Sequence, residues 1–138
     1  MKFSKSRGFT LIEILVVSAI ITVLVSLGLL MGFDVYRGSS FHSEVSLVSS
    51  LLMKARSKSL ANLNQVPHGL HFDSDGYTLI PENELISKSP TVEVSASQAD
   101  IVFDQLNGDT NEAEVTIKDK NSAREVTIYI NEEGRINW

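Results

Sequence analysis

The chain has 138 residues, which is enough for one small domain and an apolar anchor. It contains no cysteine, so a disulfide framework and thiolate chemistry are excluded. Beyond Phe33 the chain holds 9 Lys and Arg against 16 Asp and Glu, a net charge of −7, which disfavours binding to nucleic acid or anionic lipid through bulk electrostatics.

Residues 9–33 form an almost unbroken apolar run in which Glu13 is the only ionisable side chain. At about 1.5 Å per residue this run spans roughly 37 Å as a helix, enough to cross a bilayer core of about 30 Å. The run is too long and too uniformly apolar for a buried core helix. A secretory signal peptide would carry its small-residue cleavage site after the apolar region, and no such site is evident there. We therefore predict a membrane anchor.

Three basic residues, Lys2, Lys5 and Arg7, precede the apolar run, and no acidic residue comes before Glu13. The positive-inside bias predicts a cytoplasmic N-terminus and places the rest of the chain outside. An ionisable side chain within lipid is energetically costly and usually has a function. Glu13 is therefore a candidate functional residue.

An amphipathic pattern follows a looser stretch expected at residues 36–40. Apolar residues recur there at spacings of four and three, which predicts one buried face of a helix. The residues of this stripe are Phe41, Val45, Val48, Leu52 and Ala55, widened by Leu51, Leu60 and Leu63. The residues predicted on the opposite, solvated face are Glu44, Lys54, Arg56 and Lys58.

From Val66 onward the apolar residues alternate, which predicts strands. Asp73-Ser74-Asp75-Gly76 is typical of a hairpin turn, and residues 82–90 and 107–112 read as loops. Expected strand positions are Leu70, Phe72, Tyr77, Leu79, Val92, Val94, Ile101, Val102, Phe103, Val115, Ile117, Val126, Ile128 and Ile130, and a turn at residues 131–134 leads toward Ile136. The predicted fold class is α+β, a long N-terminal helix whose distal half packs on one small antiparallel sheet.

Catalytic and metal-binding patterns are weak. His68, His71, Asp73 and Asp75 could supply metal ligands, but strand alternation puts the two histidines on opposite faces, and hairpin chemistry explains the aspartates more simply. No arrangement places a nucleophile against a base. We expect no enzyme, no metal and no cofactor. His42 is interpreted as solvated, and Trp138 either packs on the sheet or contacts a partner.

The motif Gly8-Phe9-Thr10-Leu11-Ile12-Glu13 resembles the processing signal of type IV prepilins and of the pseudopilins of type II secretion. In that family a membrane peptidase cuts after the glycine and methylates the new N-terminus. The resemblance implies cleavage between Gly8 and Phe9, N-methylation of Phe9, and a role for Glu13 in filament assembly.

Looser patterns resemble the GspH/FimT-like group of this family. The helix pattern L-x-x-A-R-x-x-A is matched at residues 52–59, with Ser59 in place of the second alanine. Residues 101–108 resemble the mid-domain strand of the group, and residues 124–136 its closing strands. The tryptophan expected before the mid-domain glycine is absent, although Tyr77 follows Gly76 nearby.

The resemblance implies a leader at 1–8, a transmembrane half-helix at 9–33, an amphipathic half-helix at 34–63 and a β-rich periplasmic part at 64–138. It implies a minor pseudopilin of a type II secretion filament, anchored in the inner membrane. Its partners would be other pilin-like subunits, the prepilin peptidase and the assembly platform.

Two alternatives remain open. The first is a FimT/FimU-like minor pilin that primes a type IV pilus or serves DNA uptake, against which the acidic balance argues mildly. The basic residues available for DNA, Lys118, Lys120, Arg124 and Arg135, are diluted by neighbouring acids. The second is a membrane-anchored module in which the sheet domain binds a ligand.

Overall fold

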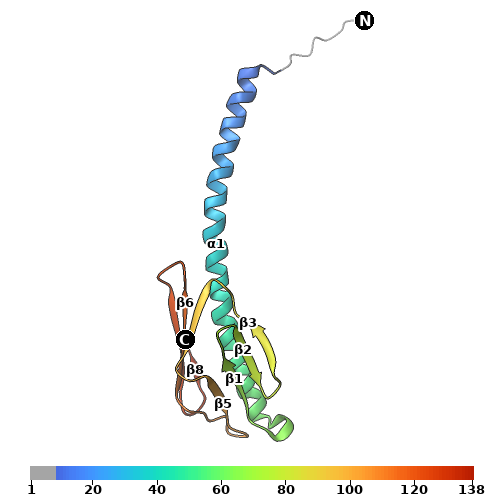
Figure 1. The fold of residues 1–138 in the computed structure, drawn as a ribbon, viewed down its shortest axis with the longest axis vertical. Helices are drawn as coiled ribbons and strands as arrows, with labels where there is room; N and C mark the ends of the chain where they lie inside the picture. Colours follow the sequence, from blue (N-terminus) through green and yellow to red (C-terminus); the bar gives the residue numbers. More distant parts are fainter. Residues whose placement is uncertain (1–8) are drawn as a thin grey trace, which may run out of the picture. The chain divides into compact units, whose positions relative to one another are not determined.

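The computed structural model describes the backbone of residues 9–138, and the side chains of residues 9–28 and 39–138. This part of the chain contains one long helix, a short 3₁₀ helix and eight strands (Figure 1). Their bounds are α1 Leu11–Leu60, η1 Leu63–Gln65, β1 His68–Phe72, β2 Gly76–Ile80, β3 Glu84–Ser87, β4 Val92–Ala96, β5 Asp100–Phe103, β6 Ala113–Asp119, β7 Glu125–Ile130 and β8 Ile136–Asn137. The predicted α+β class is confirmed.

The chain divides into two compact units, Met1–Arg37 and Gly38–Trp138, and α1 contributes to both. Helical backbone continues through residues 36–40, where the sequence predicted a looser stretch. A glycine inside a helix costs only about 1 kcal/mol relative to alanine, which is too little to end a helix of this length at Gly38.

The predicted apolar stripe of α1 is buried in the second unit, from Phe41 to Ala55, and Leu51 is buried with it. Leu60 and Leu63 were predicted to widen this stripe, but they are 42% and 45% exposed. The helical spacing explains the difference for Leu60, because the inward position that follows Ala55 by four residues is Ser59, which is fully buried.

The strands form two four-stranded antiparallel sheets rather than the single sheet predicted. The strand orders are β3-β2-β1-β5 in the first sheet and β4-β6-β7-β8 in the second. The predicted hairpin is confirmed, with Phe72 opposite Tyr77 across β1 and β2. The buried faces of both sheets and the inward stripe of α1 join in one hydrophobic core.

One segment predicted as a loop, residues 82–90, contains β3. Alternation failed to reveal this strand because β3 lies at the edge of its sheet, where three of its four residues are exposed. Only Ile86 packs against the core. The other predicted loop, residues 107–112, contains no strand.

Candidate functional site

The first turn of α1 is closed by reciprocal hydrogen bonds between Thr10 and Glu13. The backbone N–H of Thr10 donates to Oε2 of Glu13 at 3.2 Å, and the N–H of Glu13 donates to Oγ1 of Thr10 at 3.3 Å. The Thr10 hydroxyl also donates to Oε2 of Glu13, at 3.3 Å. Because α1 begins at Leu11, Thr10 is the N-cap and Glu13 the third helical residue, which is the arrangement of a capping box.

The capping box was missed at the sequence level, although T-x-x-E before an apolar run is its signature. It gives Glu13 a local role in capping the helix N-terminus, in addition to the predicted role in filament assembly. The carboxylate satisfies a helix-start N–H and lies where the helix dipole favours negative charge.

The apolar side chains of residues 14–28, which follow Glu13, are all exposed. Residues 11–28 form a helix long and apolar enough to cross a membrane, and none of this segment is buried. Three hydroxyls on it are satisfied within the helix: Ser18 donates to the carbonyl of Leu15, Thr22 to that of Ser18, and Ser26 to that of Thr22. With its hydroxyls satisfied internally, this surface is compatible with a lipid or helix neighbour.

The structure describes two of the three predicted site residues, Phe9 and Glu13. Gly8 lies outside the described residues. Phe9 directly precedes the capped turn and is 81% exposed. Glu13 lies in the first turn of α1. Cleavage after Gly8, methylation of Phe9 and the assembly role of Glu13 stay predictions.

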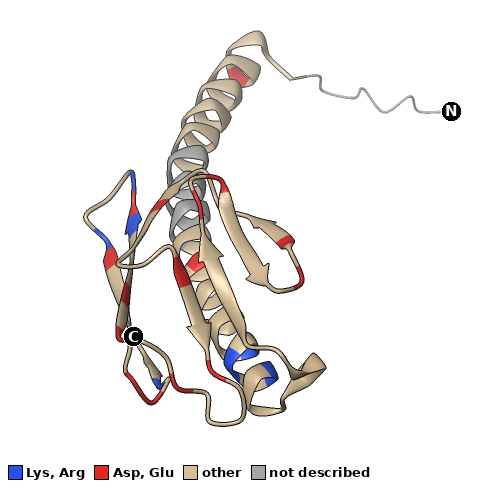
Figure 2. Cartoon of the chain, turned by 60° about the horizontal axis from the view of Figure 1, so that its bottom comes forward, with Lys and Arg blue, Asp and Glu red and all other residues tan. Residues whose placement is uncertain are grey.

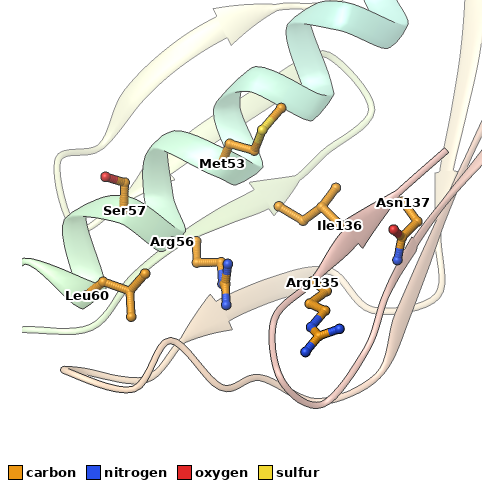
Figure 3. Close-up of a pocket in the computed structure, with 7 residues that line it drawn as sticks. All are labelled: Met53, Arg56, Ser57, Leu60, Arg135, Ile136 and Asn137. Carbon is orange, nitrogen blue, oxygen red and sulfur yellow. The ribbon is translucent and has the colours of Figure 1, made fainter.

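A groove of about 440 Å³ lies in the second unit, between the end of α1 and strand β8 (Figure 3). Its lining residues are Met53, Arg56, Ser57, Leu60, Arg135, Ile136 and Asn137. In Figure 3 the Arg56 side chain extends from the helix toward the turn before β8, and Arg135 lies beside that turn. The groove therefore combines positive charge with apolar walls.

The two arginines are held by the same turn. Nη2 of Arg56 donates to the Glu133 carbonyl at 2.9 Å, and Nε of Arg135 lies 3.0 Å from Oε2 of Glu133. The turn also needs Gly134, whose φ of 69° is left-handed and whose Cβ, if present, would collide with the carbonyl of Gly108.

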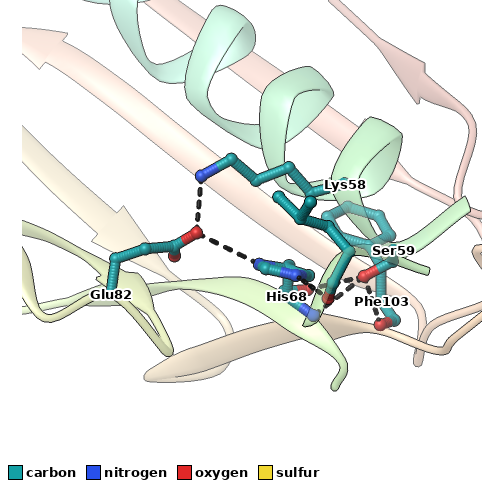
Figure 4. A network of polar contacts seen from close by, with 6 residues as sticks. Lys58, Ser59, His68, Glu82 and Phe103 are labelled. Atoms are coloured by element: carbon teal, nitrogen blue, oxygen red, sulfur yellow. Dashed lines mark hydrogen bonds and ion pairs between the residues drawn. The ribbon is translucent and has the colours of Figure 1, made fainter. Parts of the chain in front are cut away.

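A polar network joins the end of α1 to the first sheet (Figure 4). The buried Ser59 hydroxyl donates to the Phe103 carbonyl at 2.8 Å and accepts the N–H of His68 at 2.8 Å. Glu82 lies 2.5 Å from Nζ of Lys58 and 3.3 Å from Nδ1 of His68. Burial acts to raise the pKa of Glu82, but hydrogen bonds from Lys58 and the backbone, with the Lys58 charge, lower it below its ordinary value of 4.5.

Two residues predicted on a solvated helix face, Glu44 and Arg56, have roles inside the fold. Glu44 is only 5% exposed, accepts the Tyr77 hydroxyl at 2.6 Å and accepts the Ser89 N–H at 3.3 Å. A carboxylate can occupy an inward position of a helix when buried donors face it, and helical periodicity alone does not reveal those donors.

The candidate metal ligands do not converge. His68 is buried, with Nε2 2.9 Å from the Leu63 carbonyl, whereas Nδ1 of the partly exposed His71 lies 2.6 Å from Oδ1 of Asp100. The predicted placement of the two histidines on opposite sides of β1 is confirmed. Among the described residues no group of three His, Asp or Glu side chains is arranged to hold a metal ion.

Comparison with known proteins identifies the N-terminal segment. Residues 3–29 match the family model described as the prokaryotic N-terminal methylation motif. This is the signal of type IV pilin-like prepilins, and it includes Gly8, Phe9 and the capped Glu13. No curated protein and no solved structure matches the chain.

Proposed function

We propose that the chain is a minor pseudopilin, a subunit of the short periplasmic filament of a type II protein secretion system. The observation that carries this proposal is the methylation motif at residues 3–29, because it coincides with a membrane-length helix whose apolar side chains are all exposed. A helix of this kind needs lipid before assembly and neighbouring helices after it.

Processing prepares the chain for assembly in this proposal. A prepilin peptidase cuts between Gly8 and Phe9 and methylates the new amino group of Phe9. Before cleavage, the basic leader holds the N-terminus on the cytoplasmic side of the inner membrane, and the second unit lies in the periplasm. The assembly platform of the membrane then passes the processed subunit to the filament.

Glu13 would carry the charge that selects the correct register between subunits. An acidic side chain at the centre of a membrane helix costs about 2.5 kcal/mol or more on insertion scales, which is an upper bound for Glu13 in the first turn. The capping box offsets part of the cost through Oε2, and among the described residues Oε1 accepts no hydrogen bond. The amino group of Phe9 on a neighbouring subunit is a suitable partner for this second oxygen, because opposite charges stabilise each other strongly in a medium of low dielectric constant.

The direct test is the mass of the protein made with and without a prepilin peptidase. The expected product lacks residues 1–8 and carries one additional methyl group on the amino group of Phe9. It appears only when the peptidase is present. An intact leader in the presence of an active peptidase would instead favour a tethered ligand-binding module, for which the groove beside β8 is the available site.

The FimT/FimU-like alternative is separated by a mobility shift assay with DNA at several salt concentrations. Binding through phosphates weakens steeply with salt. Two of the basic residues available for such binding are already paired with acids, Lys118 with Glu125 at 3.4 Å and Arg135 with Glu133. If no shift of the DNA is seen at low salt, the result favours the proposed subunit of a secretion filament over a pilin that binds DNA.

A further inference from the structure

Strand β8 leaves one edge of its sheet open beside the groove. It is the last strand in the order β4-β6-β7-β8, so only its β7 side carries a strand partner among the described residues. The carbonyl of Arg135 accepts the N–H of Asn131 at 3.2 Å, and Asn137 lies opposite Tyr129 of β7. Because successive residues of a strand point their backbone groups in opposite directions, those of Ile136 face the open edge.

The open edge is lined by groups that suit an acidic and apolar strand. Arg135 is exposed, and its Nε lies near Glu133. A guanidinium group has further N–H donors, and these can bind a second carboxylate. Across the groove, Met53 and Leu60 present apolar side chains that are more than two-fifths exposed. An unpaired strand edge can pair with a strand of another chain, and pockets beside the edge then select the side chains of the added strand.

The second unit also contains a strand with the complementary properties. β3 is one of the two end strands of the other sheet, in the order β3-β2-β1-β5. It begins with the exposed acid Glu84, and the next residue, Leu85, is 61% exposed. Figure 2 shows basic residues on the last turns of α1 and also around the hairpin of β6 and β7, and acidic residues spread over the helix, strands and loops.

We propose that strand β3 of one copy of this chain adds to the open edge of β8 in a second copy. Glu84 pairs with Arg135, and Leu85 enters the groove against Met53 and Leu60 of the second copy. Since the two surfaces differ, the contact is heterologous: the first copy keeps a free β8 edge and the second keeps a free β3 edge, so the contact can repeat along a line of subunits.

A two-residue edge makes a small contact, so copies that are dilute in solution associate weakly. When copies are anchored in one membrane, the effective concentration of neighbouring copies is higher. The contact then forms more often, although the interface itself gains no further interactions. The interface belongs wholly to the second unit and does not rest on the proposal about cleavage or Glu13.

The test uses disulfide cross-linking, for which the cysteine-free chain is well suited. Two full-length variants, Leu85→Cys and Met53→Cys, are co-expressed in membranes and oxidised mildly. The proposal expects a mixed dimer that contains one copy of each variant. The control pairs Leu85→Cys with Ser46→Cys, an exposed helix position outside the groove, and expects little product.

A charge exchange provides the second readout. Arg135→Glu in the Met53→Cys copy is expected to lower the mixed dimer about two- to fivefold, which is the range that an exposed ion pair contributes. Glu84→Arg in the Leu85→Cys copy should restore it. Retained protease resistance of each variant in membranes shows that the fold is intact.

Three outcomes overturn the proposal. The first is an equal yield from the Ser46→Cys control, which would mean random collision. The second is a mixed dimer insensitive to the charge exchange. The third is cross-linking of Leu85→Cys or Met53→Cys only to a protein of different mass, which would assign the edge to a foreign partner.

Discussion

The hydroxyl of Tyr77 donates a 2.6 Å hydrogen bond to Oε1 of Glu44, and both side chains are buried. The bond joins β2 to α1 across 33 residues of sequence. Burial is the main cause that raises the pKa of Tyr77 well above 10.0, and the hydrogen bond and charge of Glu44 add to it. The pair therefore contributes to stability and gives it a pH dependence.

Replacing the donor should destabilise the second unit. Tyr77→Phe keeps the ring but leaves Oε1 of the buried carboxylate without its hydrogen bond, at a cost of about 1.5–3 kcal/mol. The measurement is the free energy of unfolding in urea for the full chain in detergent. Tyr129→Phe, at an exposed position of β7, is the matched control and should change this free energy little.

The same pair predicts a loss of stability in alkali. Because the folded-state pKa of Tyr77 lies above the unfolded value of about 10, the unfolded chain loses this proton first as pH rises. Stability from Tyr77 is therefore complete below pH 10 and is lost as pH rises toward the raised pKa. The difference in unfolding free energy between the wild type and Tyr77→Phe should narrow above pH 10. A constant difference from pH 8 to alkali would contradict this.

Ser59 should be hard to replace by alanine, although alanine is the residue that the resembling helix pattern carries there. Ser59→Ala removes the acceptor of the His68 N–H and the donor to the Phe103 carbonyl, both buried, and should cost about 1–3 kcal/mol. Ser50→Ala is the control, because the Ser50 hydroxyl is exposed and donates only to its own helix. Thermal unfolding of the two variants side by side checks the prediction.

Lys58 and Glu82 should stabilise the fold by a modest, acid-sensitive amount. The pair is partly solvated, so Glu82→Gln is expected to cost less than about 1 kcal/mol at pH 7. Because the pKa of Glu82 is lowered in the folded state, this stability is present above pH 4.5 and is lost as pH falls through the folded-state pKa. Urea titrations at pH 7 and at a series of lower pH values should show the cost shrink as pH falls below 4.5.

Two substitutions at Glu13 separate helix capping from charge pairing. Glutamine can replace glutamate in a capping box, so Glu13→Gln keeps the helix start but removes the charge, whereas Glu13→Ala removes both. If subunits pair through the charge, both variants should be processed normally and both should enter filaments poorly. The measurement is the fraction of processed protein in sheared filaments, and normal incorporation of Glu13→Gln would assign Glu13 to capping alone.

Much of the fold follows from short-range patterns. The hairpin at Asp73–Gly76, the strands around Ile101 and Ile117, and the buried stripe from Phe41 to Ala55 were all predicted, because each depends on residues within a few positions of one another. The capping box is equally local, because it depends only on Thr10 and on Glu13 three residues later.

Other features depend on which segments meet in space. Glu44 looked solvated because its partner Tyr77 lies on another element, and β3 looked like a loop because an edge strand shows little alternation. The division into two sheets and the groove beside β8 likewise depend on long-range strand pairing.

The methylation motif, the membrane-length helix and the helix and strand pattern follow from residues that are neighbours along the chain. The buried Glu44–Tyr77 pair, the role of Ser59 and the open edges of β3 and β8 become visible only in the folded chain. A polar group can be buried when folding places a hydrogen-bond partner beside it, and a strand edge stays open when folding places no strand there. In both cases the relevant neighbours are distant in the sequence.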